Sequence, residues 1–312
     1  MGGVNEVAEN IYLIDSQLYS IPQYGSVYLI NEEKKALVDT GPATSAEAVL
    51  DGINKAGVRP EEIDYLIITH IHLDHAGGAG LLTKSMPRAQ VLVHHRGSRH
   101  LVNPAKLVSS VIEAQGEEAM MKNGEVVPIE AARVKPVYDG DTLRLSERQL
   151  LQFIDAPGHA PHELCIYETR NKGLFTGDVI GIYIAESEVL LPVTPPPGFD
   201  SKLYVDSLEK LMELNIARLY FAHFGVTSEV QGILKLAVHK IKVWDEIVIQ
   251  AMTESKFDGV AERMAAQRYA ELEPLKTKES LYNHLFDNVN NANVAGFIKY
   301  YREKFTTEQT EG

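Results

Sequence analysis

Metal-binding residue types are concentrated at positions 69–78, which read THIHLDHAGG. Three histidines and one aspartate fill four of six consecutive positions there: His70, His72, Asp74 and His75. They follow directly on an apolar run, YLII at 65–68. Imidazole and carboxylate donors together suit zinc, iron or manganese better than calcium or magnesium. The pattern therefore favours a metal site over a crowded polar turn.

Three more candidate ligands stand at the ends of apolar runs. LLQFIDAPGH ends in His159, GLFTGD ends in Asp178 and RLYFAH ends in His223. Strands that finish at a common sheet edge bring the residues after them together. Seven candidate ligands collected in this way are enough for two metal ions.

The elements that must position these residues follow from the apolar pattern. Helical spacing recurs between the strands, and two strand-rich halves with interspersed helices predict a layered α/β or α+β domain. After residue 225 the pattern is helical only, which indicates a helical extension. The predicted strands are 11–15, 26–31 and 35–41, which we expect to be antiparallel, then 64–70, 89–95, 134–141, 150–156, 163–169, 172–178 and 218–225. The predicted helices are 44–58, 77–85, 104–123, 201–215, 228–254, 259–271, 278–287 and 293–304.

Composition limits the classes of function. The chain of 312 residues has a formal net charge of −13, which argues against binding nucleic acid through a broad basic face. It has a single cysteine, which fits a reducing compartment. No signal peptide and no apolar stretch long enough to span a membrane is visible in the sequence. We therefore expect a cytoplasmic protein that acts on a small molecule, without nucleic acid or membrane as partner.

The motifs THIHLDHAGG, APGHAPHE, TGD and FAHFG resemble those of the metallo-β-lactamase fold hydrolases, in the same order, over about residues 7–225. The resemblance implies an α+β fold, a four-layer αββα sandwich, with a dinuclear site along the sheet edge. It predicts a metallo-β-lactamase-like domain at 1–225 and a helical extension at 226–312 that covers the active site. By the same resemblance, the first metal would be bound by His70, His72 and His159, the second by Asp74, His75 and His223, with Asp178 bridging.

Hydrolysis is the chemistry that such a site implies. Two divalent ions, with zinc favoured and iron or manganese as alternatives, would hold a bridging hydroxide that attacks an ester-type carbonyl or phosphorus. Asp74 would orient that nucleophile or pass a proton to the leaving group, so no serine or cysteine nucleophile is needed. The branches that this chain resembles in layout, glyoxalase II and the quinolone-signal response thioesterase, predict cleavage of a small-molecule thioester, ester or lactone.

Other activities of the family remain alternatives. A mononuclear iron oxidoreductase resembling persulfide dioxygenase would leave the second metal site empty, although its ligands are present here. Phosphodiester cleavage is a further alternative. The diiron flavoprotein branch has the pattern H-x-E-x-D, whereas His72 stands at its middle position, that of the glutamate, here. A regulatory protein with a structural metal site and a partner-binding tail is the remaining hypothesis.

Residues around the ligands have predicted supporting roles. Asp39 in LVDTG and His162 are candidates for orienting a metal-bound histidine from behind. For Asp39 the alternative is that it only caps the turn. The apolar stretch 179–199, with Tyr183 and Phe199, is a candidate wall of the substrate pocket, where packing of the helices is the competing interpretation. His94, His95 and His100 are assigned structural or solvent-facing roles. The C-terminal helices are also candidates for a homodimer interface.

Overall fold

A computed structural model describes residues 3–255 and 259–311. The chain divides into two compact units that are not consecutive in sequence. The first unit contains residues 1–155, 162–177 and 216–228, and the second contains 156–161, 178–215 and 229–312. The predicted domains, 1–225 and 226–312, do not coincide with these compact units and remain a prediction about folding units.

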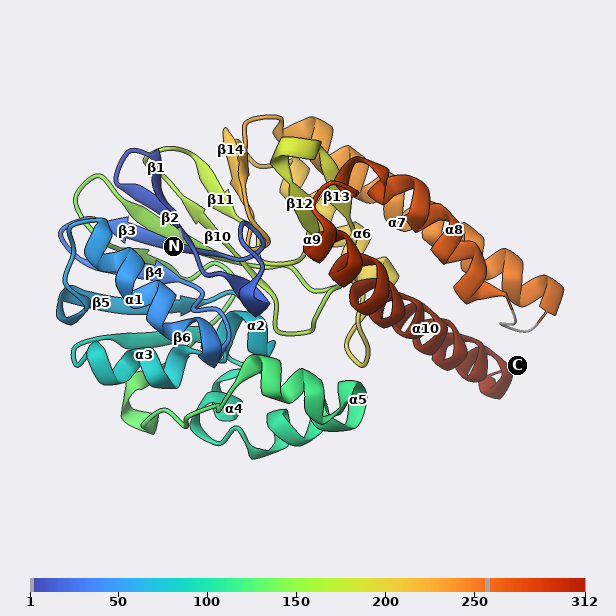
Figure 1. The fold of residues 1–312 in the computed structure, drawn as a ribbon, viewed down its shortest axis with the longest axis horizontal. Coiled ribbons are helices and arrows are strands. Elements are labelled where there is room, and N and C mark those ends of the chain that lie inside the picture. Colours follow the sequence, from blue (N-terminus) through green and yellow to red (C-terminus); the bar gives the residue numbers. More distant parts are fainter. Residues whose placement is uncertain (1–2, 256–258, 312) are drawn as a thin grey trace. The chain divides into compact units, whose positions relative to one another are not determined.

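Two β-sheets form the framework of the first unit (Figure 1). The first sheet has the strand order β1-β2-β3-β4-β5-β6-β7, antiparallel from β1 to β4 and parallel from β4 to β7. The second has the order β15-β14-β11-β10-β9-β8. The strands of the first sheet are β1 Val4–Ala8, β2 Ile11–Asp15, β3 Ser26–Asn31, β4 Lys35–Val38, β5 Ile63–Ile68, β6 Gln90–His94 and β7 Val134–Val137. Those of the second are β8 Thr142–Arg144, β9 Leu150–Asp155, β10 Leu164–Glu168, β11 Gly173–Phe175, β14 Arg218–Tyr220 and β15 Val226–Thr227.

Alternation of side chains along the strands of the first sheet builds two separate cores. Leu66 and Ile68 of β5 face one way and join the core that α1 and α3 cover. Ile67 faces the other way, into the core shared with the second sheet. The first unit is therefore two sheets packed face to face, with helices on the outer face of the first sheet. Its helices are α1 Ala46–Lys55, α2 Leu73–Ala76, α3 Ala79–Ser85, α4 Ser98–Val102 and α5 Ala105–Asn123.

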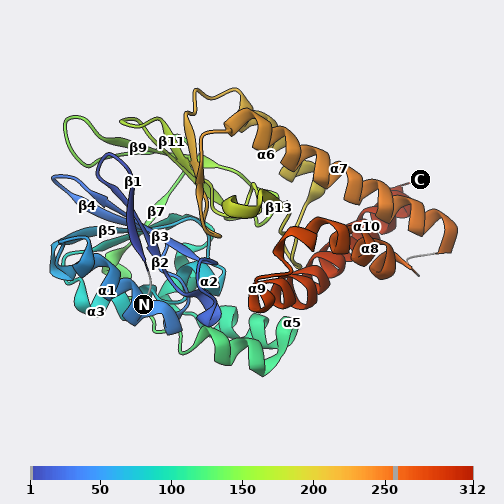
Figure 2. The ribbon, with the colours of Figure 1, turned by 45° about the horizontal axis from the view of Figure 1, so that its top comes forward.

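The second unit is mainly helical. It contains α6 Ser201–Met212, α7 Val230–Ser255, α8 Val260–Leu272, α9 Glu279–His284 and α10 Asn290–Glu311, with a hairpin of β12 Ile182–Ile184 and β13 Val189–Leu191. Within this unit α6 packs along α7, and α8 packs against α7 and α10 (Figure 2). Trp244 of α7 is fully buried, and the guanidinium of Arg268 lies 4.5 Å from its ring centre. None of the helices in the described part of the chain is long and apolar enough to cross a membrane.

The predicted elements are present, with shorter bounds for several strands. The strand predicted at 134–141 ends at Val137, and the one predicted at 218–225 ends at Tyr220. The antiparallel arrangement of the first three predicted strands is confirmed. Five strands were not predicted: β1, β8, β12, β13 and β15. Each has five residues or fewer, too short for a clear alternation of apolar and polar positions.

Candidate metal centre

Two neighbouring parallel strands of the first unit position the histidine-rich segment, residues 69–78. β4 and β5 both end at the same edge of the sheet, and the segment after each strand continues from that edge. Asp39 follows β4 and Thr69 follows β5. The backbone nitrogen of Thr69 donates to Oδ1 of Asp39 at 2.9 Å, and its hydroxyl lies 2.9 Å from both carboxylate oxygens. Asp39 is only 3% exposed, so this buried carboxylate fixes the start of the segment.

His75 is held from two sides. Its backbone carbonyl accepts hydrogen bonds from the Thr40 hydroxyl at 2.7 Å and the Thr40 amide at 2.8 Å. Its ring nitrogen Nδ1 lies 3.1 Å from Oδ2 of Asp39. A carboxylate at Nδ1 favours the proton on that nitrogen, so that Nε2 carries the lone pair that a metal needs. Asp39 therefore lies behind His75, and its role in orienting a metal-bound histidine stays a prediction.

Asp74, His75 and His223 converge within the first unit. One donor atom from each lies within 4.8 Å of the others. Oδ2 of Asp74 lies 3.6 Å from Nε2 of His75 and 3.7 Å from Nε2 of His223. Both histidines are 3% exposed and Asp74 is 23% exposed, so the carboxylate alone reaches solvent to a notable degree. Two imidazoles and a carboxylate at this spacing fit a transition metal or zinc ion.

The turn that carries His223 is anchored by a buried tyrosine. The hydroxyl of Tyr28, on β3, donates to the carbonyls of Phe221 at 2.8 Å and Gly225 at 3.0 Å. Burial raises the pKa of this hydroxyl, so it remains a donor throughout the physiological range. The ring of Tyr24 lies 5.1 Å from the imidazole of His223, between centroids. β3 and the 221–225 turn are therefore fixed to each other across a large separation in sequence.

His70 is buried beside the other histidines and has a carboxylate neighbour. Its Nδ1 lies 3.1 Å from the Thr69 hydroxyl and 3.3 Å from Oε2 of Glu163, which is 1% exposed. Its ring centre lies 4.7 Å from that of His72 and 4.0 Å from that of His75. The sequence analysis did not single out Glu163. The available signal was a charged residue that ends the motif APGHAPHE and directly precedes a buried strand.

Gly177 leaves the space that the Glu163 carboxylate occupies. It has a φ of +51°, and a Cβ at this position would lie 1.9 Å from Oε1 of Glu163. A larger residue at 177 would therefore displace the neighbour of His70. The glycine of TGD thus has a packing role in the site, besides allowing the turn before Asp178.

His162 lies among the histidines as a neutral residue. Its ring centre is 5.7 Å from that of His72 and 6.3 Å from that of His70, and its Nδ1 accepts from the backbone nitrogen of Ile71 at 3.5 Å. Burial first, and then nearby histidines led by His72, lower its pKa to about 3. The orienting role predicted for His162 stays a prediction.

The second unit brings His159 and Asp178 together. Nε2 of His159 lies 3.6 Å from Oδ2 of Asp178. Nδ1 of His159 lies 2.8 Å from the carbonyl oxygen of Val193, which fixes the ring by a backbone group. The carbonyl of Asp178 accepts from the Gly181 amide at 2.9 Å and from the Tyr204 hydroxyl at 3.0 Å. Of the seven predicted ligands, five therefore belong to the first unit, and His159 and Asp178 belong to the second.

The predicted pocket residues lie inside the second unit. Phe199 is 6% exposed, and its ring centre lies 4.7 Å from that of Phe297 and 5.7 Å from that of Tyr300. Tyr183 is in the β12–β13 hairpin and is also 6% exposed. Both side chains therefore take part in packing, and a role in binding substrate remains a prediction. His94, assigned a structural role, is buried with Nε2 at 3.3 Å from Oδ1 of Asp155.

The sequence matches the model of the metallo-beta-lactamase superfamily over residues 21–223. It is 30% identical over 213 residues to the metallo-beta-lactamase fold-containing protein ST1585 of Sulfurisphaera tokodaii, covering 66% of this chain and 75% of that protein. The crystal structure of ST1585 matches with a TM-score of 0.63 and 27% identity, covering 74% of this chain and 85% of that one. The chain therefore belongs to the metallo-beta-lactamase superfamily, and the predicted α+β fold is confirmed.

Two further relatives represent different chemistries within this superfamily of metal-binding proteins. An N-acyl homoserine lactonase of Bacillus cereus is 26% identical over 244 residues, covering 69% of this chain and 85% of the lactonase. The flavo-diiron protein FprA2 of Clostridium acetobutylicum is 28% identical over 193 residues, but this chain covers only 40% of its length. The superfamily includes hydrolases, and oxidoreductases are among the homologues of this chain.

Proposed function

We propose that this protein is a dinuclear metal-dependent hydrolase that cleaves a small-molecule thioester, ester or lactone. The observation that carries the proposal is the convergence of Asp74, His75 and His223 within 4.8 Å, with a buried carboxylate behind His75. A metal ligand braced in this way is held in one orientation and one tautomer.

The seven ligands would serve two ions. His70, His72 and His159 would bind the first ion, and Asp74, His75 and His223 the second. Asp178 would bridge the two ions. Chain connectivity supports counting Asp178 of the second unit among these ligands, because it is bonded directly to Gly177, the last residue of a segment of the first unit.

Ions bound there would supply a nucleophilic hydroxide near neutral pH and polarise the acyl carbonyl. Asp74 is the ligand with 23% exposure, and it would orient the incoming water and accept its proton. The water oxygen forms a bond to the acyl carbon, and the bond from that carbon to sulfur or oxygen breaks. Asp74 then returns the proton to the leaving group, so the carboxylate is restored at the end of the cycle.

Hydrolysis is favoured over redox chemistry by the residues and by one relative. The lactonase, of which this chain covers 85%, is named for opening a cyclic ester. The third position of H-x-H-x-D-H is His72, where the diiron flavoprotein pattern has a glutamate. A mononuclear iron oxidoreductase would not need the set of Asp74, His75 and His223. Phosphodiester cleavage remains an outcome for the experiment to decide.

The test is metal content together with hydrolysis by the full-length protein, purified without chelator and under low oxygen. We expect two metal ions per chain and turnover of at least one substrate in a panel of thioesters, lactones and phosphodiesters. His75→Ala should lower turnover by more than about 100-fold. The control His239→Ala, at an exposed position of α7, should not.

Two results would contradict the proposal. A single iron per chain that persists after metal is supplied would favour sulfur oxidation instead. Two bound metals with turnover of phosphodiesters alone would assign the protein to the phosphodiesterases.

A further inference from the structure

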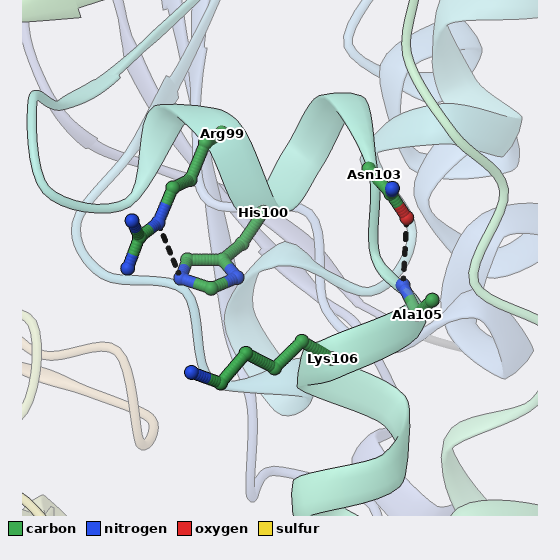
Figure 3. A pocket seen from close by; sticks show the side chains of 5 residues that line it. All are labelled: Arg99, His100, Asn103, Ala105 and Lys106. Atoms are coloured by element: carbon green, nitrogen blue, oxygen red, sulfur yellow. Dashed lines mark hydrogen bonds between the residues drawn. The ribbon is translucent and has the colours of Figure 1, made fainter.

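A basic hollow of about 450 Å³ lies between α4 and α5 of the first unit (Figure 3). Its lining residues are Arg99, His100, Asn103, Ala105 and Lys106. Figure 3 shows the side chains of Arg99 and His100 extending from α4 and that of Lys106 from the start of α5. None of the lining residues is acidic, although acidic residues outnumber basic ones by 43 to 30 in the chain.

The hollow is rich in hydrogen-bond donors. Nε of Arg99 donates to Nε2 of His100 at 3.2 Å, so the proton of the neutral imidazole is on Nδ1. Burial, and then the positive charges of Arg99 and Lys106, lower the pKa of His100 and keep it neutral. Neither Arg99 nor Lys106 forms an ion pair with a residue in the described ranges. The fork of Arg99 and the ammonium of Lys106 can therefore both bind an anion, with the neutral ring between them.

The turn that leads into α4, the helix that carries Arg99 and His100, lies against the histidine-rich segment. β5 and β6 are parallel neighbours, with Ile68 opposite Val93, so the chain after each strand continues from the same edge. A Cβ on Gly97, at the turn before α4, would lie 2.6 Å from Cγ2 of Ile71. Ile71 is the residue between His70 and His72.

We propose that the hollow of Arg99, His100 and Lys106 binds a carboxylate or phosphate group of the substrate while the substrate's ester reaches the metal ligands. This inference rests on the proposed function and narrows it to acidic esters or thioesters. The anionic group takes no part in the bond changes. Its binding energy fixes the orientation of the acyl carbon, so it determines specificity.

Two thioesters of equal chain length test the inference on the metal-loaded, full-length protein. Glutaryl and valeryl N-acetylcysteamine differ in the terminal carboxylate of the first. Arg99→Ala should raise KM for the glutaryl thioester by about 10-fold to 100-fold. For the valeryl thioester, kcat and KM should both stay within about twofold of the wild-type values. Lys106→Ala should raise the same KM by a smaller factor, because a single point charge is lost.

A matched control removes an equal charge elsewhere in the first unit. Arg144 is exposed on β8, and Arg144→Ala should leave KM for both thioesters unchanged. If Arg99→Ala and Arg144→Ala act equally, or if Arg99→Ala affects both thioesters equally, the hollow is not the anion site. If Arg99→Ala raises KM more for a phosphate-bearing ester than for the glutaryl thioester, phosphate is the preferred group.

A direct binding measurement separates this inference from the proposed function. Glutarate and inorganic phosphate are titrated into the wild type and into Arg99→Ala, with the side-chain 15Nε resonance of Arg99 and the heat of binding as readouts. Binding to the wild type that Arg99→Ala abolishes supports the anion site even if no thioester is hydrolysed. Hydrolysis of thioesters without any response to either anion keeps the proposed function and overturns this inference.

Discussion

The two units orient their predicted metal ligands by different means. In the first unit, imidazoles are backed by buried carboxylates, Asp39 behind His75 and Glu163 beside His70. In the second unit, His159 is backed by the carbonyl of Val193, a neutral group whose position depends on the conformation of its loop. A carboxylate is fixed by its own side chain, whereas a carbonyl is fixed by whatever holds the backbone. The positions of His159 and Asp178 therefore depend on the packing of the helices in the second unit.

The largest effect is expected from closing the space at Gly158. A Cβ there would lie 2.2 Å from Cα of Tyr204, in the backbone of α6, and the φ of +142° is itself unfavourable for alanine. Gly158→Ala should therefore cost the second unit about 4 kcal/mol or more in unfolding free energy. Urea unfolding followed by tryptophan fluorescence measures this, because the single tryptophan, Trp244, is in that unit.

Gly232→Ala is the matched control for that variant. Gly232 lies on α7 in the same unit, and a Cβ there meets nothing within 4 Å. Alanine at this helix position should be neutral or stabilising by up to about 1 kcal/mol. Equal urea midpoints for the two alanine variants would show that α6 can move aside at no cost.

The carboxylate brace of the first unit should come next in size. Asp39→Ala removes the acceptor for Thr69 and the partner of His75, and should lower the unfolding free energy by about 2–4 kcal/mol. Metal affinity, measured by competition with a chelator, should fall by about 10-fold to 100-fold. Asp51→Ala, which removes an exposed carboxylate paired with Lys55, should change stability by less than about 1 kcal/mol. Unchanged metal affinity in Asp39→Ala would show that the brace is structural only.

The backbone brace of the second unit depends on Asn293. Its Oδ1 accepts from the Thr194 amide at 2.6 Å and its Nδ2 donates to the Pro192 carbonyl at 2.9 Å, on either side of Val193. Asn293→Ala should cost about 1–3 kcal/mol of unfolding free energy and weaken metal binding by up to about 10-fold. Asn291→Ala, at an exposed position of the same helix, is the control for both measurements. A loss of stability without any loss of metal affinity would mean that metal binding does not depend on Asn293 of α10.

The smallest effect is a pH dependence specific to the second unit. Asp245 accepts from the Ser201 hydroxyl at 2.6 Å and from the Tyr301 hydroxyl at 2.7 Å, and burial raises its pKa above the usual value. A raised pKa means that the folded state takes up the proton first as pH falls. This contribution to stability is therefore fullest at low pH and is lost as pH rises through the folded pKa.

Comparison with Asp245→Asn isolates that contribution. The unfolding free energy of the wild type, relative to Asp245→Asn, should increase as the pH is lowered from about 7 toward about 4. Tryptophan fluorescence in urea at each pH provides the measurement. A difference between the two proteins that does not change with pH would mean that Asp245 titrates alike in the folded and unfolded states.

The sequence predicted the parts of the site that local pattern encodes. The apolar runs before His70 and His223 predicted strands, and the structure has β5 ending at Ile68 and β14 ending at Tyr220, shortly before these residues. Glu163 was missed because a single glutamate carries no periodic signal. Its position beside His70 depends on the space left by Gly177 and on the hydrogen bond from the Leu164 amide to the carbonyl of Thr69, a residue distant in sequence. The sequence pattern does not show that 156–161 and 178–215 group with the helical unit, since only tertiary contacts assign a loop to a packing unit.

The separation of His75 from His223 has a consequence for synthesis. These two residues of the convergent set are 148 positions apart. At about 5–20 residues per second, a ribosome needs roughly 7 to 30 seconds to pass from one to the other. During that interval the nascent chain carries the histidines of the THIHLDHAGG segment without their later partner. Any metal ion captured then is held by an incomplete set of ligands, so we expect the final choice of metal to be made after His223 has been added.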